Sequence, residues 1–230
     1  MADAGLCQPD KPVRAHQPVQ AIIFDCDGTL VDSERVGNAA LIECVAELGL
    51  QLSLDQALEH FAGRKMADTL AMIEAWLGKP IPDGFLPYLR ERMAAAFVAH
   101  LQPMDGVHDL LANLGIPFCV ASNGPREKML VSLRVTGLLP FFQERIFSAY
   151  DCDSWKPEPG LFHYAAHSMG IASERIAVVD DNALGIQAAA AAGMMPLGYA
   201  PHDEGLALTK AGAQVFHHMG DLLELLCLQP

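Results

Sequence analysis

Short apolar runs that end in polar residues recur along the chain. The three clearest runs lie at residues 19–24, 115–121 and 175–179, and each is followed directly by acidic, amide or hydroxyl side chains. Apolar runs of this length, rich in β-branched residues, are typical of buried parallel strands. Weaker strands are predicted at about 145–148, 195–199 and 213–216.

Helical periodicity fills the intervals between these runs. Helices are predicted at about 106–114, 125–136, 158–169, 183–192 and 219–227, and glycines mark several of their ends. Alternation of strand and helix predicts an α/β fold with a doubly wound parallel sheet. In such sheets the polar residues beyond the carboxyl ends of the strands converge on one ligand site.

Residues 34–101 break the alternation, because they carry helical patterning alone. We therefore expect an all-helical cap at 34–101, inserted into a core made of 19–33 and 102–230. A helical insertion next to a catalytic loop is well placed to act as a lid. Residues 1–18 contain charges, three prolines and no apolar run, so a flexible N-terminal tail is expected there.

Composition narrows the class of protein. With 28 acidic and 15 basic residues the formal net charge is −13, which opposes binding to nucleic acid. Six scattered cysteines without a C-x-x-C pair are typical of free thiols in a reducing compartment. With no membrane-spanning or signal segment in the sequence, we expect a cytoplasmic protein, a monomer or weak homodimer, that does not contact membranes.

Two acidic pairs follow two of the strongest predicted strands. Asp25 and Asp27 repel each other unless a proton or a cation lies between them, although Asp-x-Asp-Gly also closes ordinary turns. Asp180 and Asp181 precede a helix, where one of them, or Asn182, could instead be the N-cap. Four carboxylates at one sheet edge favour Mg²⁺ and phosphoryl transfer.

Ser122, Asn123 and Lys156 are candidate anion-binding residues. Ser122 and Asn123 end a strand just before a helix, where exposed N–H groups bind anions, although a plain N-cap is an equal alternative. Lys156 precedes a proline at a helix entrance, and its ammonium group could balance both the carboxylates and a phosphate.

These segments resemble a known family. The stretches at 25–34, 122–124, 156–159 and 180–181 are similar, in order and spacing, to the four signatures of the haloacid dehalogenase-like (HAD) superfamily. The similarity extends from about residue 20 to 227. The helical insertion resembles the cap of the subgroup that contains β-phosphoglucomutase and phosphoglycolate phosphatase, and the fold implied is a Rossmann-like core.

The resemblance also implies roles for individual residues. Asp25 is expected to attack phosphorus and form an aspartyl-phosphate, and Asp27 to protonate the leaving alkoxide and later to deprotonate water. Mg²⁺ is expected to bind the Asp25 side chain, the Asp27 backbone carbonyl and Asp181, with Asp180 at or next to the ion.

Three further residues complete the implied site. Ser122, the backbone of Asn123, and Lys156 are expected to bind the oxygens of the transferring phosphoryl group and to stabilise their charge. A binding module without catalysis is disfavoured, because both aspartates of the first signature are intact.

Family comparisons also favour one reaction. Dehalogenases of this superfamily lack the second aspartate, which is present here as Asp27. The mutases carry a histidine and a lysine where this chain has Gly37 and Ala62, so net hydrolysis is preferred over the mutase alternative. The expected enzyme is a phosphoric monoester hydrolase.

The expected substrate is a small phosphorylated metabolite. The segments around Asp25, Ser122, Trp155 and Asp180 resemble the branch of phosphatases that act on 6-phosphogluconate, which implies a sugar or sugar-acid phosphate; phosphoglycolate is the alternative substrate. Gly63, Arg64 and Lys65 lie where caps of this kind carry a specificity loop. Arg64 or Lys65 could bind a substrate carboxylate, or both could be solvated.

Overall fold

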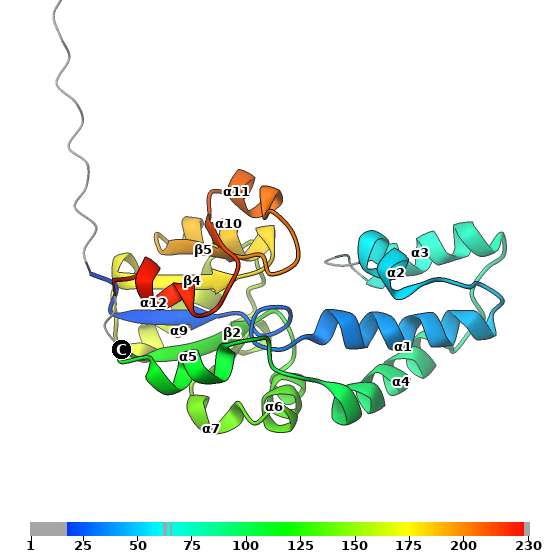
Figure 1. Cartoon of the computed structure of the whole chain (residues 1–230), viewed down its shortest axis with the longest axis horizontal. Helices are drawn as coiled ribbons and strands as arrows, with labels where there is room; N and C mark the ends of the chain where they lie inside the picture. Colours follow the sequence, from blue (N-terminus) through cyan, green and yellow to red (C-terminus); the bar gives the residue numbers. More distant parts are fainter. Residues whose placement is uncertain (1–17, 62–63, 65, 228–230) are drawn as a thin grey trace, which may run out of the picture.

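A six-stranded parallel sheet forms the centre of the protein (Figure 1). The computed structural model describes residues 18–61, 64 and 66–227. The strands, in chain order, are β1 (Ala21–Phe24), β2 (Phe118–Ser122), β3 (Ile146–Ser148), β4 (Ile176–Asp180), β5 (Met195–Tyr199) and β6 (Gln214–Phe216). Their spatial order is β3-β2-β1-β4-β5-β6.

The side of the sheet on which successive strands are added changes between β1 and β4. From β1 the chain adds β2 and then β3 on one side, whereas β4, β5 and β6 continue on the other side. Phe24 pairs with Val179 across this junction, so the residues that follow the two strands emerge side by side. Ligands bind in the crevice at such a reversal.

Both faces of the sheet are buried, as the continuous apolar runs require. Ile22 and Phe24 belong to one apolar cluster, and Ala21 and Ile23 belong to the cluster on the opposite face. The helices that surround the sheet are α5 (Val107–Asn113), α6 (Arg126–Val135), α7 (Leu139–Phe142), α8 (Ala149–Cys152), α9 (Gly160–Met169), η1 (Ser173–Arg175), α10 (Ala183–Ala191), α11 (Leu206–Ala211) and α12 (Asp221–Leu225).

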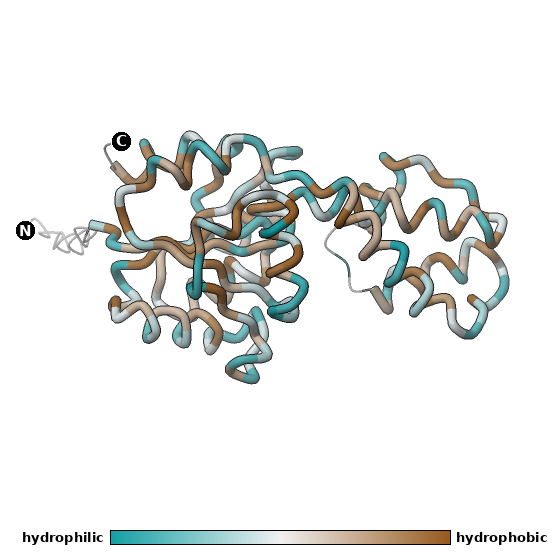
Figure 2. The backbone as a smooth tube through the Cα atoms, turned by 90° about the horizontal axis from the view of Figure 1, so that it is seen from below, coloured by the Kyte–Doolittle hydropathy of each residue, from teal (hydrophilic) through white to brown (hydrophobic). Residues whose placement is uncertain are grey.

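Four helices lie beside the sheet-bearing part as a separate group (Figures 1 and 2). They are α1 (Ser33–Glu47), α2 (Leu54–Phe61), α3 (Met66–Leu77) and α4 (Phe85–His100). Leu41, Phe61, Ile73 and Leu89 belong to an apolar cluster of their own. These helices therefore pack around an interior that is distinct from the two clusters of the sheet.

The two chain segments that join this helical group to the sheet are hydrogen-bonded to each other. The amide of Asp32 donates to the carbonyl of Gln102 at 3.0 Å, and the amide of Met104 donates to the carbonyl of Leu30 at 2.9 Å. The entrance to α1 and the exit from α4 thus form one paired connection.

The predicted α/β fold with a doubly wound parallel sheet is confirmed, and all six strands lie within a few residues of the predicted positions.

Two of the predicted helix ends have recognisable caps. Asn182 caps the start of α10, since its side chain accepts a hydrogen bond from the amide of Leu184, and α9 ends at Gly170, whose backbone is in the left-handed region. Within the part of the chain that the structure describes, no helix is both long and apolar enough to cross a bilayer.

Candidate active site

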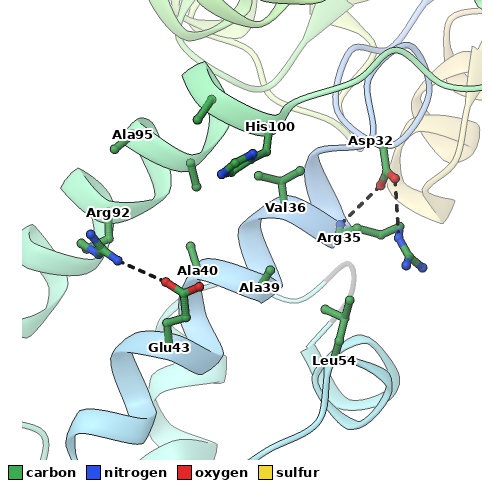
Figure 3. Close-up of a pocket in the computed structure, with 12 residues that line it drawn as sticks. Asp32, Arg35, Val36, Ala39, Ala40, Glu43, Leu54, Arg92, Ala95 and His100 are labelled. Carbon is green, nitrogen blue, oxygen red and sulfur yellow. Dashed lines mark hydrogen bonds and ion pairs between the residues drawn. The ribbon is translucent and has the colours of Figure 1, made fainter.

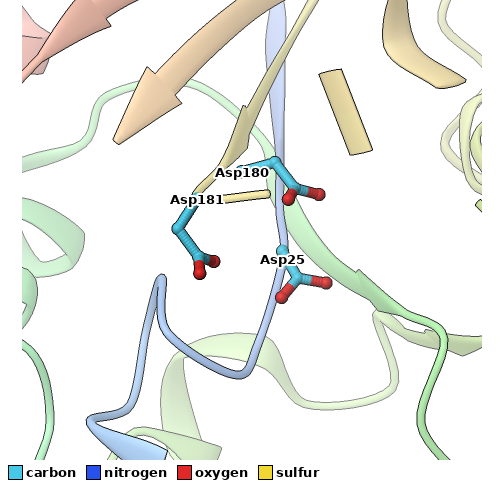
Figure 4. Close-up of side chains that lie close together, drawn as sticks. All are labelled: Asp25, Asp180 and Asp181. Atoms are coloured by element: carbon cyan, nitrogen blue, oxygen red, sulfur yellow. The ribbon is translucent and has the colours of Figure 1, made fainter. Parts of the chain in front are cut away.

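Three carboxylates meet where β1 and β4 end (Figure 4). Asp25 follows β1 directly, Asp180 is the last residue of β4, and Asp181 follows it. One oxygen from each of the three lies within 4.8 Å of the others. Asp25 and Asp180 are buried and Asp181 is half-buried. The sheet thus brings together three of the four predicted carboxylates from segments about 155 residues apart.

Lys156 inserts its ammonium group between two of these carboxylates. Its Nζ donates hydrogen bonds to Asp25 Oδ1 and to Asp180 Oδ2, the latter at 2.7 Å. The lysine side chain is only 5% exposed, and its Nζ also lies 5.2 Å from the centre of the Phe162 ring. Lys156 therefore lies among the carboxylates and is not a solvated surface lysine.

Burial and mutual repulsion perturb the titration of this group. Burial, opposed by Lys156 and reinforced by Asp180, raises the pKa of Asp25 to about 7. Burial and the charges of Asp180 and Asp25 also raise the pKa of Asp181 well above its ordinary range. The two aspartates hold the pKa of Lys156 above its usual value although burial opposes this. The three carboxylates therefore carry more negative charge than the one ammonium group of Lys156 balances.

Thr29 orients Asp181. Its hydroxyl donates to Asp181 Oδ1 at 2.6 Å and accepts from the Asp181 amide at 3.1 Å. The preceding residue, Gly28, has a φ of 81°, and a Cβ at that position would overlap the Asp181 carboxylate. Thr29 lies inside the first signature, but no pattern in the sequence predicts this role for it.

Gly185 leaves space for the carboxylate of Asp180. A Cβ at Gly185, in the first turn of α10, would overlap the Asp180 carboxylate. Asp180 Oδ1 also accepts a hydrogen bond from the amide of Asn182 at 2.9 Å. The start of α10 is thus folded tightly around this carboxylate.

The loop after β2 lies beside the carboxylates. Ser122 is buried, and its Oγ accepts from the amide of Gly124 at 3.2 Å instead of capping α6, whose N-cap is Pro125. Asn123 joins this loop to Lys156, because its Oδ1 accepts from the Lys156 amide at 2.8 Å and its Nδ2 donates to the Lys156 carbonyl at 3.3 Å. The side chain of Asn123 therefore holds two loops of the site together.

Asp27 lies at the edge of the site and faces α6. Its Oδ2 accepts from Lys128 Nζ at 2.8 Å, whereas its Oδ1 is buried without a hydrogen-bond partner among the described residues. The pKa of Lys128 is raised, because the Asp27 carboxylate outweighs the opposing effect of burial. The Asp27 side chain is not one of the three clustered carboxylates. The sequence analysis did not identify Lys128.

A family model described as haloacid dehalogenase-like hydrolase matches residues 19–193. This chain belongs to the haloacid dehalogenase-like hydrolases. It is 32% identical over 210 residues to the 6-phosphogluconate phosphatase of Escherichia coli K12, covering 90% of this chain and 94% of that protein. The phosphorylated carbohydrates phosphatase of Thermotoga maritima is 24% identical over 213 residues, or 90% of this chain and 98% of that protein.

The structure is also similar to solved members of the family. A HAD family hydrolase from Deinococcus radiodurans R1, solved with bound phosphate and sodium, superposes with a TM-score of 0.82 at 32% identity over 93% of this chain and 99% of that one. The expected membership of the HAD superfamily is confirmed, and the phosphatases among the relatives bear out the expected class of enzyme.

A cavity of about 240 Å³ adjoins the acidic edge of this HAD-like hydrolase. Asp27 and Lys128 line it from the sheet-bearing part, and α1, α2, α3 and α4 line it from the helical group. Arg64, the cap residue predicted to bind a substrate carboxylate or to be solvated, also lines it. Gly63 and Lys65, predicted with Arg64, and Ala62 lie outside the described residues.

A second cavity, of about 480 Å³, lies between α1 and α4 (Figure 3). Alanine is the commonest residue of its wall, and the charged residues at its rim are paired, Arg35 with Asp32 and Arg92 with Glu43. None of the three clustered carboxylates lines either cavity, but Asp27 lines the smaller cavity and does not line this one.

The clustered carboxylates suit Mg²⁺. Magnesium binds oxygen ligands at about 2.0–2.1 Å, so two ligands on opposite sides of the ion are about 4.2 Å apart. That separation is consistent with oxygens within 4.8 Å of one another. An all-oxygen donor set also favours Mg²⁺ over the softer metals that prefer thiolate or imidazole.

Proposed function

We propose that this HAD-like hydrolase is a magnesium-dependent phosphatase that hydrolyses a small phosphorylated sugar or sugar acid through an aspartyl-phosphate on Asp25. The observation that carries the proposal is the convergence of Asp25, Asp180, Asp181 and Lys156 at one sheet edge, next to the cavity that Asp27 lines.

Asp25 is the proposed nucleophile. A carboxylate oxygen of Asp25 attacks phosphorus, a bond forms between them, and the bond from phosphorus to the leaving oxygen breaks. Lys156 fixes the rotamer of this carboxylate through its hydrogen bond to Oδ1. Dividing one difficult hydrolysis into two displacements is the advantage of covalent catalysis.

Asp27 is the proposed acid and base. In the first displacement its carboxyl group gives a proton to the leaving alkoxide. In the second displacement the resulting carboxylate removes a proton from the water that attacks phosphorus, while Asp25 leaves as a free carboxylate and inorganic phosphate is released. Positioned proton transfer of this kind typically contributes 10²- to 10⁴-fold to the rate.

Asp25, Asp181 and the backbone carbonyl of Asp27 are the proposed magnesium ligands, with Asp180 beside them. Bound there, Mg²⁺ would supply positive charge against the phosphoryl oxygens. Ser122, the backbone of Asn123, and Lys156 would bind the same oxygens from the protein side. Electrostatic positioning of this kind supplies most of the catalysis in phosphoryl transfer.

The proposed substrate class rests on the cavity and on the relatives. A cavity of about 240 Å³ suits a small ligand. Arg64 lines it as a cation that could meet an anionic leaving group, such as a sugar acid. The relatives from Escherichia coli and Thermotoga maritima are named for 6-phosphogluconate and phosphorylated carbohydrates, and 6-phosphogluconate is therefore the first compound to test.

Residues 34–101 are proposed to act as a cap over the site. Two observations support this. The helical group has its own apolar interior, and the cavity is lined both by the helical group and by the sheet-bearing part. The paired connection at residues 30–32 and 102–104 would then serve as the hinge.

A screen of phosphorylated metabolites with Mg²⁺ tests the proposal. We expect phosphate release from 6-phosphogluconate, or from at least one of phosphoglycolate, 2-deoxyglucose 6-phosphate and β-glucose 1-phosphate, and reversible loss of activity with EDTA. Conversion of β-glucose 1-phosphate to an isomer without free phosphate would instead indicate a mutase. Activity that persists in EDTA would exclude the magnesium assignment.

A further inference from the structure

We propose that Lys128 is the positioning residue for the acid and base of this enzyme: it holds one oxygen of Asp27 so that the other carries the transferred proton. This inference rests on the proposed phosphatase function and goes beyond it, because Lys128 belongs to none of the four family signatures in the sequence.

The two oxygens of Asp27 have different surroundings. Oδ2 accepts a hydrogen bond from Lys128 Nζ at 2.8 Å, and Oδ1 is buried without a described partner. An ammonium group has three donors and no acceptor, so the oxygen bound to it is a poor place for a proton. The proton that Asp27 gives and takes therefore belongs on Oδ1.

Lys128 is held from both parts of the protein. Its backbone lies in the first turn of α6, directly after the loop that carries Ser122 and Asn123. Its Nζ lies 5.6 Å from the ring centre of Phe97, near the end of α4. A cation over an aromatic face is attracted to it, so Phe97 helps to fix where the ammonium group lies. The orientation of Asp27 is thereby linked to the helical group.

A role in folding does not account for this pair. The side chains of Lys128 and Asp27 are 41% and 27% exposed, and ion pairs with this much solvent access contribute little to stability. Substitution of Lys128 should therefore leave the fold intact, so that its effect on the reaction can be measured separately.

The test compares two leaving groups in the Lys128→Met variant. An alkyl phosphate, the best substrate from the metabolite screen, needs a proton on its leaving oxygen, whereas p-nitrophenyl phosphate leaves as a stable phenolate without one. We expect kcat/KM for the alkyl phosphate to fall about 10- to 100-fold, a part of the usual contribution of acid–base catalysis. For p-nitrophenyl phosphate we expect kcat/KM to change by less than about threefold, since it reports only the steps up to departure of the leaving group.

A second readout is the amount of phosphorylated enzyme, which is measured directly and not through a rate. Because water attack on the aspartyl-phosphate also needs Asp27 in place, the variant should accumulate phosphorylated protein during reaction with p-nitrophenyl phosphate. Intact-mass measurement after an acid quench detects this species, and the wild type should show less of it. Lys128→Arg keeps a cationic donor and should restore part of the lost alkyl phosphatase activity.

Lys210→Met, at an exposed position in the last turn of α11, is the matched control and should behave as wild type. Equal losses with both substrates, or no loss with either, in a folded Lys128→Met protein would overturn the proposal while leaving the phosphatase assignment standing. If the wild type releases phosphate from neither substrate, the proposed function itself fails and the inference fails with it.

Discussion

Buried charges at the sheet edge compensate one another only in part. Lys156 pairs with Asp25 and Asp180 but not with Asp181, so with the three carboxylates and this ammonium group ionised two negative charges remain. Isolated buried charge costs several kcal/mol or forces a change in pKa, and the raised pKa of Asp25 and Asp181 is that response. A divalent cation is the partner that would balance the group.

The substitution Thr29→Val tests whether the hydrogen bond from Thr29 orients Asp181 for metal binding. Valine keeps the shape of the buried threonine but removes the hydroxyl that donates to Asp181 Oδ1. Because groups that orient metal ligands are typically worth 10- to 100-fold in affinity, we expect the Mg²⁺ concentration for half-maximal activity to rise about tenfold or more.

Thr136→Val is the matched control for Thr29→Val. It also removes a buried hydroxyl, one that donates to the carbonyl of Ser132 within the core, but Thr136 is not part of the site. We expect it to lower thermal stability without changing the Mg²⁺ requirement. An unchanged requirement in Thr29→Val would mean that Asp181 does not need the threonine, or that Asp181 does not bind the ion.

The sequence identified the aspartates and Lys156 but not the residues that support them. Asp25, Asp180 and Asp181 were predictable, because parallel strands deliver their carboxyl ends to one edge. Thr29 and Lys128 were not, since each meets an aspartate more than 100 positions away, and a side-chain direction within a loop has no periodicity to reveal it.

At the scale of elements, the loops of the site depend on glycine where a carboxylate approaches the backbone. Helix α10 begins against Asp180, and the Cβ of any other residue at Gly185 would occupy the place of that carboxylate. Glycine within a helix ordinarily costs up to about 1 kcal/mol relative to alanine. Glycine is required here because only its missing Cβ allows the buried carboxylate of Asp180 to lie against the start of the helix.

Gly185→Ala should therefore destabilise the protein despite the better helix propensity of alanine. Overpacking typically costs about 1–3 kcal/mol, which exceeds the gain of up to about 1 kcal/mol, so the free energy of unfolding should fall and activity should fall with it. Urea denaturation measures the change.

Gly220→Ala provides the comparison for Gly185→Ala. Gly220 is the N-cap of α12, with helical backbone angles and open space where a Cβ would lie, so alanine there should change the free energy of unfolding by less than about 1 kcal/mol. A Gly185→Ala protein as stable and as active as wild type would show that the Asp180 carboxylate is not fixed where the structure places it.

Sequence periodicity located the strands and the longer helices but missed three short helices. All six strands were predicted, because buried strands carry continuous apolar runs between turn residues. Helices α7, α8 and α11 contain only four to six residues, which is too short for a helical repeat to be recognised. Their positions follow from tertiary packing instead.

At the scale of the whole molecule, the helical group and the sheet meet at the cavity lined by Asp27 and Lys128. Helical patterning at 34–101 predicted a group of helices, but it could not give their placement. That placement depends on the paired connection between residues 30–32 and 102–104 and on Phe97 beside Lys128, which are contacts between segments far apart in sequence.

Stability of the whole protein should respond to Mg²⁺ in a pH-dependent way. The fold raises the pKa of Asp25 from 3.8 to about 7, so without metal this group favours the folded state below about pH 4 and that contribution is lost as the pH rises through 7. Mg²⁺ binds deprotonated carboxylates, so its stabilising effect should grow over the same interval.

The measurement is the difference in Tm with saturating Mg²⁺ and with EDTA, taken between about pH 6 and about pH 8. We expect the difference to increase with pH, and to be much smaller in Asp181→Asn at every pH. A difference that is constant or falls with rising pH would contradict the assignment of these carboxylates to the ion.

Trapping the covalent intermediate tests the central claim most directly. The enzyme is mixed with substrate and Mg²⁺, quenched in acid, reduced with borohydride to mark the phosphorylated carboxyl group, and mapped by peptide mass spectrometry, with Asp25→Asn as the control. The account predicts a mark at Asp25 alone, and neither a mark nor measurable turnover in the variant. A mark at another residue, or an Asp25→Asn protein that retains even a tenth of the activity, would contradict it.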